Sequence, residues 1–225
     1  MDLAKSLEFL NPMSVRERIH IIGCGAIGST LAENLARFGF TKFTLYDFDR
    51  VEPHNIANQM FTQQDIGKYK TDAVTEMIGR INPDALKTVR KVNEGWKPDT
   101  RLAGYVFLCV DNIDIRRQIA TENLNNLNIK AMFDFRMGLT DAQHYAANWS
   151  SEISKKEFLK TMNFTHEEAA KAVPVSACNM TLSVCPTVRC IVGLGASNFV
   201  NFIKQKPLRK TVLIDAFDFS LEAYE

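Results

Sequence analysis

Short apolar segments alternate with amphipathic segments along the first two thirds of the chain. Residues 105–110 form an uninterrupted apolar run, as expected for a strand that is covered on both faces. Strands are predicted over residues 18–22, 42–46, 86–92, 105–110 and 131–135. Apolar positions three or four apart predict helices over residues 29–38, 70–81 and 113–124. This repeated order predicts an α/β fold with a doubly wound, mainly parallel sheet and helices on both faces.

The remainder of the chain has a different pattern. Residues 142–149 alternate apolar and polar side chains as a strand does, whereas residues 150–176 are polar and only weakly periodic. We expect this polar stretch to be a partly helical crossover or a loop. A helix is predicted over residues 187–203 and a closing strand over residues 211–217. We interpret the chain as one domain with a core at 15–148, a crossover segment at 150–178, and a closing helix and strand at 187–217.

Composition narrows the classes of protein that this chain can be. Its 225 residues, 46% hydrophobic and 24% charged, are ordinary for a soluble globular domain. A formal net charge of +1 gives no basic surface for a nucleic acid. No apolar run approaches the roughly 18 residues that span a bilayer, and residues 1–9 lack an apolar signal core. We therefore expect a cytoplasmic protein without a membrane or nucleic-acid partner.

The five cysteines do not indicate a disulfide framework. Their number is odd, their spacing is irregular, and no pair has the Cys-x-x-Cys spacing of a zinc site. Cys24 and Cys109 fall in a glycine-rich turn and a buried strand, so we interpret them as structural.

A glycine-rich turn follows the first predicted strand and opens a helix. Gly23, Gly25 and Gly28 have the G-x-G-x-x-G spacing, which lets the backbone turn tightly and approach a phosphate at a helix N-terminus. Asp47 ends the second strand, where a carboxylate can accept hydrogen bonds from ribose hydroxyls. The pair predicts a Rossmann-like nucleotide site without separating NAD from ATP. The alternatives are a turn without a ligand and a solvated acid at a strand end.

A longer polar stretch follows the second strand and separates these possibilities. Residues 45–59 read LYDFDRVEPHNIANQ, and residues 65–70 read DIGKYK. Asp111-Asn112 follows the buried strand, Arg116 follows them, and Arg136 ends the next strand. These pieces, in this order, resemble the D-x-D-x-V, N-x-x-R-Q, D-x-G-x-x-K and Asp-Asn motifs of the ThiF/MoeB/HesA family of ubiquitin-activating-type adenylyltransferases. The resemblance covers residues 19–145 well and residues 187–203 loosely.

The resemblance implies ATP-dependent adenylation of the C-terminal carboxylate of a ubiquitin-like or sulfur-carrier protein. It implies Mg²⁺ as cofactor, with Asp111 as its ligand, and a homodimer. It also implies Lys70 and Asp111 as catalytic residues. By the same resemblance, the nucleotide-binding residues are Gly23, Gly25, Gly28, Asp47, Asp49, Asn55, Gln59, Lys70, Asp111 and Asn112.

The chemistry of adenylation explains why these residue types are needed. A carboxylate oxygen attacks the α-phosphorus of ATP, and the departing pyrophosphate must be stabilised by cations, N–H donors and a metal ion. A magnesium ion that is also held by phosphate oxygens needs few protein carboxylates, so Asp111 alone suffices. The alternatives are a solvated lysine at a helix start for Lys70 and a helix N-cap for Asp111.

The sequence departs from the family pattern at one cation. Asn58 stands where the family usually has an arginine before the glutamine, and Arg50 or Lys68 are the candidates to replace that charge. Arg16 and Arg18 are the nearest match to an N-terminal arginine segment, although flanking charges before a strand are the plainer interpretation. Because of Asn58, a catalytically degenerate scaffold subunit is one alternative function. An NAD-dependent enzyme is the other, and it leaves the polar stretch unexplained.

Two cysteines are candidates for onward thioester or persulfide chemistry. Some relatives use a cysteine beyond the core strands, and Cys178 follows the polar excursion at such a position. Cys185, which precedes the apolar helix, is the second candidate. A thiol near a helix N-terminus has a lowered pKa, which aids attack. The alternative for both is a small buried apolar residue.

Overall fold

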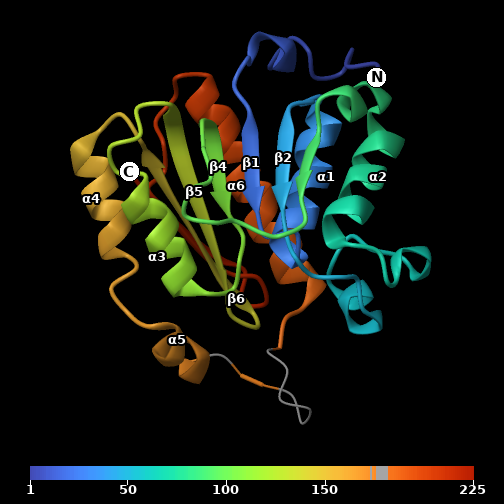
Figure 1. Ribbon diagram of the computed structural model, residues 1–225. Coiled ribbons are helices and arrows are strands. Elements are labelled where there is room, and N and C mark those ends of the chain that lie inside the picture. Colours follow the sequence, from blue (N-terminus) through green and yellow to red (C-terminus); the bar gives the residue numbers. More distant parts are fainter. Residues whose placement is uncertain (173, 176–181) are drawn as a thin grey trace.

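An eight-stranded sheet with the order β3-β2-β1-β4-β5-β6-β7-β8 runs through the molecule, and helices cover both of its faces (Figure 1). The computed structural model describes residues 1–172, 174–175 and 182–225. The predicted fold class, a doubly wound and mainly parallel α/β sheet, is confirmed.

Five strands form the parallel part of the sheet. Every residue of β1, β2 and β4 is buried, because helices cover these strands on both faces. The parallel strands are β1 (Ile19–Ile22), β2 (Phe43–Tyr46), β3 (Arg90–Val92), β4 (Gly104–Leu108) and β5 (Ile129–Met137). The sheet continues in antiparallel pairing through β6 (Asp141–Asn148), β7 (Thr211–Asp215) and β8 (Ser220–Tyr224). All parallel strands end at one side of the molecule, which we call the carboxyl end of the sheet.

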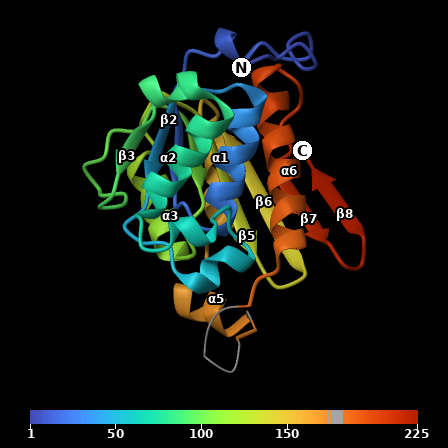
Figure 2. The same cartoon turned by 90° about the vertical axis from the view of Figure 1, so that its right-hand side faces the viewer.

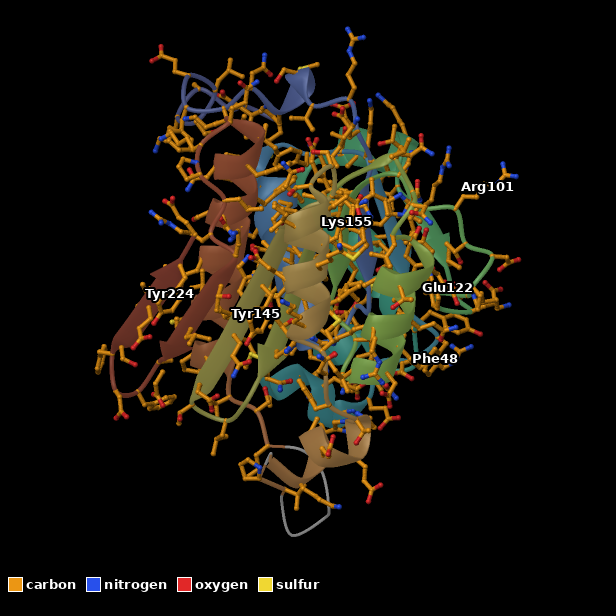
Figure 3. The ribbon with its side chains drawn as sticks, turned by 90° about the vertical axis from the view of Figure 1, so that its left-hand side faces the viewer. Phe48, Arg101, Glu122, Tyr145, Lys155 and Tyr224 are labelled. Atoms are coloured by element: carbon orange, nitrogen blue, oxygen red, sulfur yellow. The ribbon has the colours of Figure 1, made fainter. Side chains whose placement is uncertain are left out.

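Helices α1, α2 and α6 lie on one face of the sheet, and α3 and α4 lie on the other (Figures 1 and 2). Their bounds are α1 (Ala26–Phe38), α2 (Lys70–Ile81), α3 (Ile113–Glu122), α4 (Glu152–Lys160), α5 (His166–Ala172) and α6 (Cys185–Ile203). Short 3-10 helices are η1 (Pro12–Ser14), η2 (Pro53–Ala57), η3 (Gln63–Asp65) and η4 (Pro83–Lys87). Figure 3 shows the second face, where Lys155 Nζ of α4 donates to Leu124 O at 2.7 Å and joins α4 to the end of α3.

Two apolar cores fill the space between the sheet and its helical layers. Under α1, α2 and α6, Phe199 packs edge-on against Phe107 of β4 with the ring centroids 5.2 Å apart. Under α3 and α4, Trp149 and Phe158 pack edge-on at 6.0 Å. Buried aromatic side chains contribute strongly to such cores. The two cores hold the N-terminal ends of α1 and α3 at the carboxyl end of the sheet.

The structure corrects several predicted boundaries. The helix predicted over 29–38 begins at Ala26, because Gly25 is its N-cap. The strand predicted over 86–92 is wrong in its first half, where Pro83 opens η4 and only Arg90–Val92 pair. The polar stretch 150–176 contains α4 and α5 within its described residues. Strand β8 was not predicted. In the described parts of the chain, no helix has the length and apolar character needed to cross a membrane.

Candidate functional site

The loop between β1 and α1, residues 23–28, is the centre of the candidate site and is called the glycine loop. It lies at the carboxyl end of the sheet, where β2 and β4 pair with opposite sides of β1. Such a switch point is where open α/β sheets bind their ligands. The order of strands thus gives the glycine loop the position that a nucleotide site requires.

The three glycines of this loop differ in the space that is available for a side chain. Gly23 has a φ of +95°, and a Cβ there would lie 2.7 Å from the backbone of Cys109 on the adjacent strand connection. A Cβ at Gly28 would lie 1.8 Å from Gly23 O, so α1 can pack on the loop only with glycine. A Cβ at Gly25 would meet no atom within 4 Å. Gly23 and Gly28 are therefore fixed by the fold, whereas Gly25 forms an open surface beside the helix N-terminus.

Asp47 connects the end of β2 to the glycine loop. Its Oδ2 accepts the N–H of Cys24 at 2.6 Å, and its Oδ1 accepts the N–H of Asp49 at 2.8 Å. Burial raises the pKa of Asp47, while these two N–H groups and Lys70 act in the opposite direction. Asp47 is thus buried, not a solvated acid, and it orients the loop. Each carboxylate oxygen keeps a further lone pair, so the predicted bond to ribose stays compatible with this geometry.

The residues from Asp49 to Lys70 form a polar loop whose two ends lie side by side. Arg50 and Tyr69 form an isolated antiparallel bridge, and the Lys70 N–H donates to Asp49 O at 2.9 Å. Lys70 Nζ lies 2.7 Å from Asp49 Oδ2, and Lys70 is only 8% exposed. The alternative of a solvated lysine at a helix start is therefore wrong. The polar loop brings the Lys70 ammonium close to Asp47 and the glycine loop.

Inside the polar loop, Asn55 and Gln59 are the residues predicted to face the phosphates. Asn55 is 5% exposed, and its Oδ1 accepts the Glu52 N–H at 2.9 Å, so it shapes η2. Gln59 Oε1 is buried and has no hydrogen-bond donor among the described residues. The Met60 N–H donates to Ser29 Oγ at 3.1 Å, which holds this part of the loop on α1. Among the described residues, neither Asn55 Nδ2 nor Gln59 Nε2 has a hydrogen bond, so both side chains keep the N–H donors that a phosphate oxygen accepts.

Asp111 and Asn112 divide their roles at the start of α3. Asn112 is the N-cap, and its Oδ1 accepts the N–H groups of Asp114 at 2.9 Å and Ile115 at 3.2 Å. The capping alternative for Asp111 is therefore wrong, and the cap belongs to Asn112. Asp111 is exposed, and within the described ranges its carboxylate has no hydrogen bond or ion pair. A free carboxylate fits a magnesium ion that is held mainly by phosphate oxygens. The described residues contain no cluster of three or more His, Cys, Asp or Glu side chains suited to a metal.

Arg116 and Arg136, which match the family motifs, are both bound to buried Asp134. Arg116 Nη1 lies 2.5 Å from Asp134 Oδ1, and Arg136 Nε lies 2.7 Å from Asp134 Oδ2. Arg116 also donates to the carbonyl oxygens of Phe135 and Val110. These contacts join α3 to the ends of β4 and β5. The two arginines therefore support the site and are not free cations.

The cations considered as replacements for an arginine at position 58 also have partners. Arg50 donates to Gly67 O at 2.7 Å and stacks 4.0 Å from the centroid of the Tyr69 ring. Lys68 pairs with Glu76 at 2.6 Å and with Asp65 at 3.2 Å. Arg18, which was compared with the family's N-terminal arginine segment, precedes β1 at the opposite end of the sheet, where it donates to Phe43 O and Thr88 O. The structure gives none of these cations a free group at the glycine loop.

The cysteines differ in accessibility. Cys178 lies outside the described residues. Cys185 is the first residue of α6 and is half-buried. Burial raises the pKa values of the Cys24 and Cys109 thiols, which agrees with structural roles for both.

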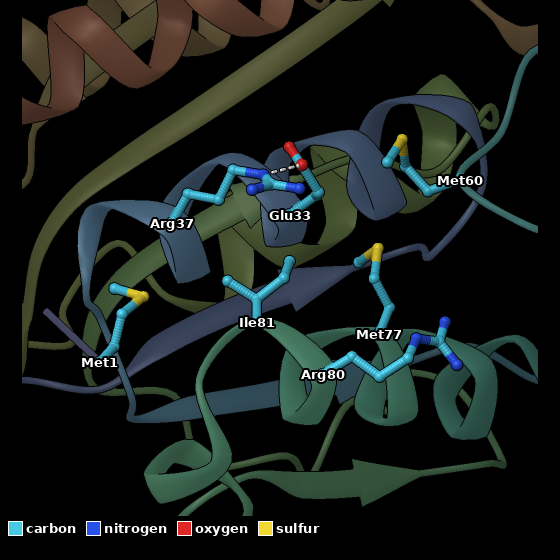
Figure 4. A pocket seen from close by; sticks show the side chains of 7 residues that line it. All are labelled: Met1, Glu33, Arg37, Met60, Met77, Arg80 and Ile81. Carbon is cyan, nitrogen blue, oxygen red and sulfur yellow. Dashed lines mark hydrogen bonds and ion pairs between the residues drawn. The ribbon is translucent and has the colours of Figure 1, made fainter.

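A cavity of about 540 Å³ lies between α1 and α2, away from the glycine loop (Figure 4). Glu33 and Arg37 of α1 pair above it, and Met77 and Arg80 of α2 lie across from them. None of the residues implied by the resemblance lines this cavity. Met60, which directly follows Gln59, also lines it, so the cavity adjoins the polar loop and not the glycine loop.

Comparison with known proteins decides the family. The ThiF family model matches residues 14–223, nearly the whole chain. The chain belongs to the ThiF family. It is 31% identical over 144 residues to ubiquitin-like modifier-activating enzyme 5 of Drosophila mojavensis. The matched region covers 57% of this chain and 35% of that protein. The chain thus spans about a third of the length of this curated relative. The family recognised from the sequence motifs is confirmed.

Solved structures share the fold of this ThiF chain. The crystal structure of E. coli MccB with AMPCPP and MccA has a TM-score of 0.72 at 16% identity and covers 95% of this chain and 65% of that one. The E. coli MccB structure with ATP has a TM-score of 0.71 at 17% identity, with coverages of 100% and 72%. At these identities, the likeness demonstrates the fold alone.

Proposed function

We propose that this ThiF chain binds Mg-ATP and adenylates the C-terminal carboxylate of a ubiquitin-like or sulfur-carrier protein. The observation that carries the proposal is the return of the polar loop, with Lys70 Nζ at 2.7 Å from Asp49 Oδ2 beside the glycine loop. A buried ammonium, free helix N–H groups and an unpaired Asp111 at one end of a sheet suit a polyphosphate. An NAD site does not need this polar loop.

The relatives support the same class of reaction. One relative is named a ubiquitin-like modifier-activating enzyme, and structures of MccB contain ATP, AMPCPP or MccA. Their nucleotide and polypeptide are the kinds of ligand that we propose for this chain.

In the proposed reaction, a carboxylate oxygen of the polypeptide attacks the α-phosphorus of ATP. The bond from that phosphorus to the bridging oxygen breaks, and the oxygen leaves with pyrophosphate while an acyl-adenylate forms. The N–H groups that open α1 bind phosphate oxygens, and Lys70 exchanges part of its contact with Asp49 for a phosphate. Asp111 would hold magnesium, which neutralises phosphate charge when bound. Asp47 keeps the glycine loop oriented toward the ribose.

The test is a thermal shift of the purified chain with Mg-ATP and, separately, with NAD. A ligand at about 100 times its dissociation constant stabilises the fold by roughly 2.7 kcal/mol, which is easily measured. We expect a shift with Mg-ATP that is lost in Asp111→Ala. A shift with NAD alone would overturn the proposal. No shift with either ligand would favour the catalytically degenerate scaffold.

We also propose, from the resemblance, that a cysteine thiolate attacks the acyl carbon of the adenylate, so that a thioester forms, the bond to the phosphate oxygen breaks and AMP leaves. Cys178 is the first candidate and Cys185 the second. A thiol-sensitive adduct with the polypeptide that is lost in Cys178→Ala and kept in Cys185→Ala would assign the step to Cys178. An adduct that survives both changes would contradict it. Sedimentation of the purified chain would test the expected homodimer.

A further inference from the structure

Helix α6 brings one arginine to the first turns of α1. Both helices begin at the carboxyl end of the sheet and run side by side along the same face (Figure 2). Arg189 is in the second turn of α6, and side chains on a helix lean toward its N-terminus. The Arg189 side chain is thereby directed toward the same end of the molecule as the glycine loop.

The contacts of Arg189 place its guanidinium between α1 and the polar loop. Nη1 donates to Thr30 Oγ1 at 2.8 Å and lies 2.6 Å from Met60 Sδ. Thr30 is buried in the first part of α1, just after Gly28 and Ser29. Met60 directly follows Asn58 and Gln59 in the polar loop. The guanidinium therefore lies next to the segment that lacks an arginine at position 58.

This positive charge has no negative partner among the described residues. Its contacts there are a hydroxyl and a thioether, which is a weak acceptor for a group with five N–H donors. Residues 173 and 176–181 contain no Asp or Glu that could supply a counter-charge. A half-buried guanidinium without a counter-ion is unfavourable, so this position favours an anionic ligand. By contrast, Lys68, Arg116 and Arg136 pair with carboxylates of the protein, and exposed Arg50 donates to Gly67 O.

We propose that Arg189 contacts the terminal phosphates of ATP and supplies the guanidinium that position 58 lacks. This inference rests on the proposed function and adds a phosphate-binding residue to it. The Cys24 N–H is bound to Asp47, the residue that the proposed function assigns to the ribose. Thr30 lies further along α1, away from that side. A nucleotide whose ribose is at Asp47 thus extends its β- and γ-phosphates toward Arg189, and AMP does not reach it.

The experiment measures the dissociation constants of Mg-ATP and AMP by calorimetry for matched variants. Arg189→Gln removes the charge and keeps a donor for Thr30, whereas Arg189→Ala removes both. We expect either change to weaken Mg-ATP binding by about tenfold or more and to leave AMP binding within about twofold. Arg37→Ala, which removes an exposed arginine of α1 that pairs with Glu33, is the control and should leave both constants unchanged.

A rescue variant separates phosphate binding from a structural role. Asn58→Arg in the Arg189→Gln background should restore most of the lost Mg-ATP affinity, because it returns a guanidinium to the same segment. Unliganded Arg189→Gln should unfold no earlier than the unmodified chain, since an unpaired charge is removed while a donor for Thr30 is kept. If the unmodified chain binds Mg-ATP and Arg189→Gln binds it equally well, the inference fails and the proposed function stands. If the unmodified chain binds no Mg-ATP, both fail.

Discussion

Lys70 Nζ and Asp49 Oδ2 lie 2.7 Å apart although 21 positions separate them in the sequence. The pair closes the polar loop, because the Lys70 N–H also donates to Asp49 O. Asp49 is half-exposed whereas Lys70 is nearly buried, so the carboxylate can turn toward solvent while the ammonium stays in place. The pair thus holds a positive charge ready beside the glycine loop before a nucleotide binds.

Lys70→Ala is therefore expected to reduce catalysis much more than stability. Loss of one positioned cation at a developing phosphate charge costs about 100-fold in pyrophosphate formation. The free energy of unfolding should fall by no more than about 1 kcal/mol, since the partner carboxylate can be hydrated. Pyrophosphate release and urea unfolding measure the two effects.

Lys68→Ala is the matched control for this change. Lys68 is two positions away and pairs with buried Asp65 of the same loop and with Glu76 of α2. Its loss should leave pyrophosphate formation within about twofold of the unmodified rate. Equal losses in the two variants would show that the loop needs its overall charge and not the Lys70 ammonium.

Gly25→Ala is expected to weaken Mg-ATP binding without unfolding the chain. The added methyl group meets no protein atom within 4 Å, so the fold accommodates it, but it projects from the surface that faces the ligand. A loss of about tenfold in affinity corresponds to ~1.4 kcal/mol. Gly28→Ala should instead destabilise the chain, because its Cβ would lie 1.8 Å from Gly23 O. Calorimetry and thermal unfolding distinguish the two, and an unchanged Mg-ATP affinity in Gly25→Ala would contradict the proposed surface.

Asp111→Ala and Asn112→Ala should affect different properties, namely ATP binding and stability, although the residues are adjacent. Asn112 caps α3, so its loss should lower the free energy of unfolding by about 1 kcal/mol. Asp111 has no partner among the described residues, so its loss should cost little stability and remove the magnesium dependence of ATP binding. ATP titrations with and without magnesium measure the magnesium dependence of binding, and urea unfolding measures the free energy of unfolding. A stability loss confined to Asp111→Ala would reverse the assignment.

The sequence was sufficient for the sheet and the glycine loop because both follow from local rules. Buried parallel strands are apolar along their whole length, and the G-x-G-x-x-G spacing follows from two close backbone approaches, at Gly23 and Gly28. The end strand β8 has only a weak signal, since its alternation rests on Leu221 and Ala223 and all five of its residues are exposed. Leu86 was assigned to a strand from its type, yet it is half-exposed on η4.

The side-chain contacts of the candidate site were less predictable from the sequence than the sheet and the glycine loop. Local rules allow a helix N-cap at either Asp111 or Asn112, and only the backbone geometry assigns it to Asn112. Arg189 and Thr30 are 159 positions apart, so their contact depends on how α6 packs against α1. Nothing local marks Arg189 as a site residue, although its position near the start of an apolar helix sets it apart from the surrounding residues. Long-range packing is the information that the motifs lacked.

The buried His144 predicts how stability depends on pH. Its Nδ1 lies 3.1 Å from Asp134 O, which can only accept, and its Nε2 lies 3.1 Å from Asn198 Nδ2, which can only donate. These partners fix a neutral ring with the proton on Nδ1. A second proton would face the Asn198 N–H. Burial lowers the pKa of His144 from 6.5 to about 4, and burial likewise lowers the pKa of His20 to about 4.

Because the folded pKa is lowered, the unfolded chain binds protons that the folded chain does not bind between about pH 6.5 and pH 4. The free energy of unfolding should therefore fall as the pH is lowered through this window, by up to about 1.4 kcal/mol per pH unit for each histidine. Urea unfolding between pH 7.5 and pH 4.5 measures the slope. His144→Gln should reduce that slope by about half, even if it lowers stability at neutral pH, and His54→Gln is the control for losing an exposed imidazole. An unchanged slope in His144→Gln would show that the folded and unfolded chains protonate this ring at the same pH.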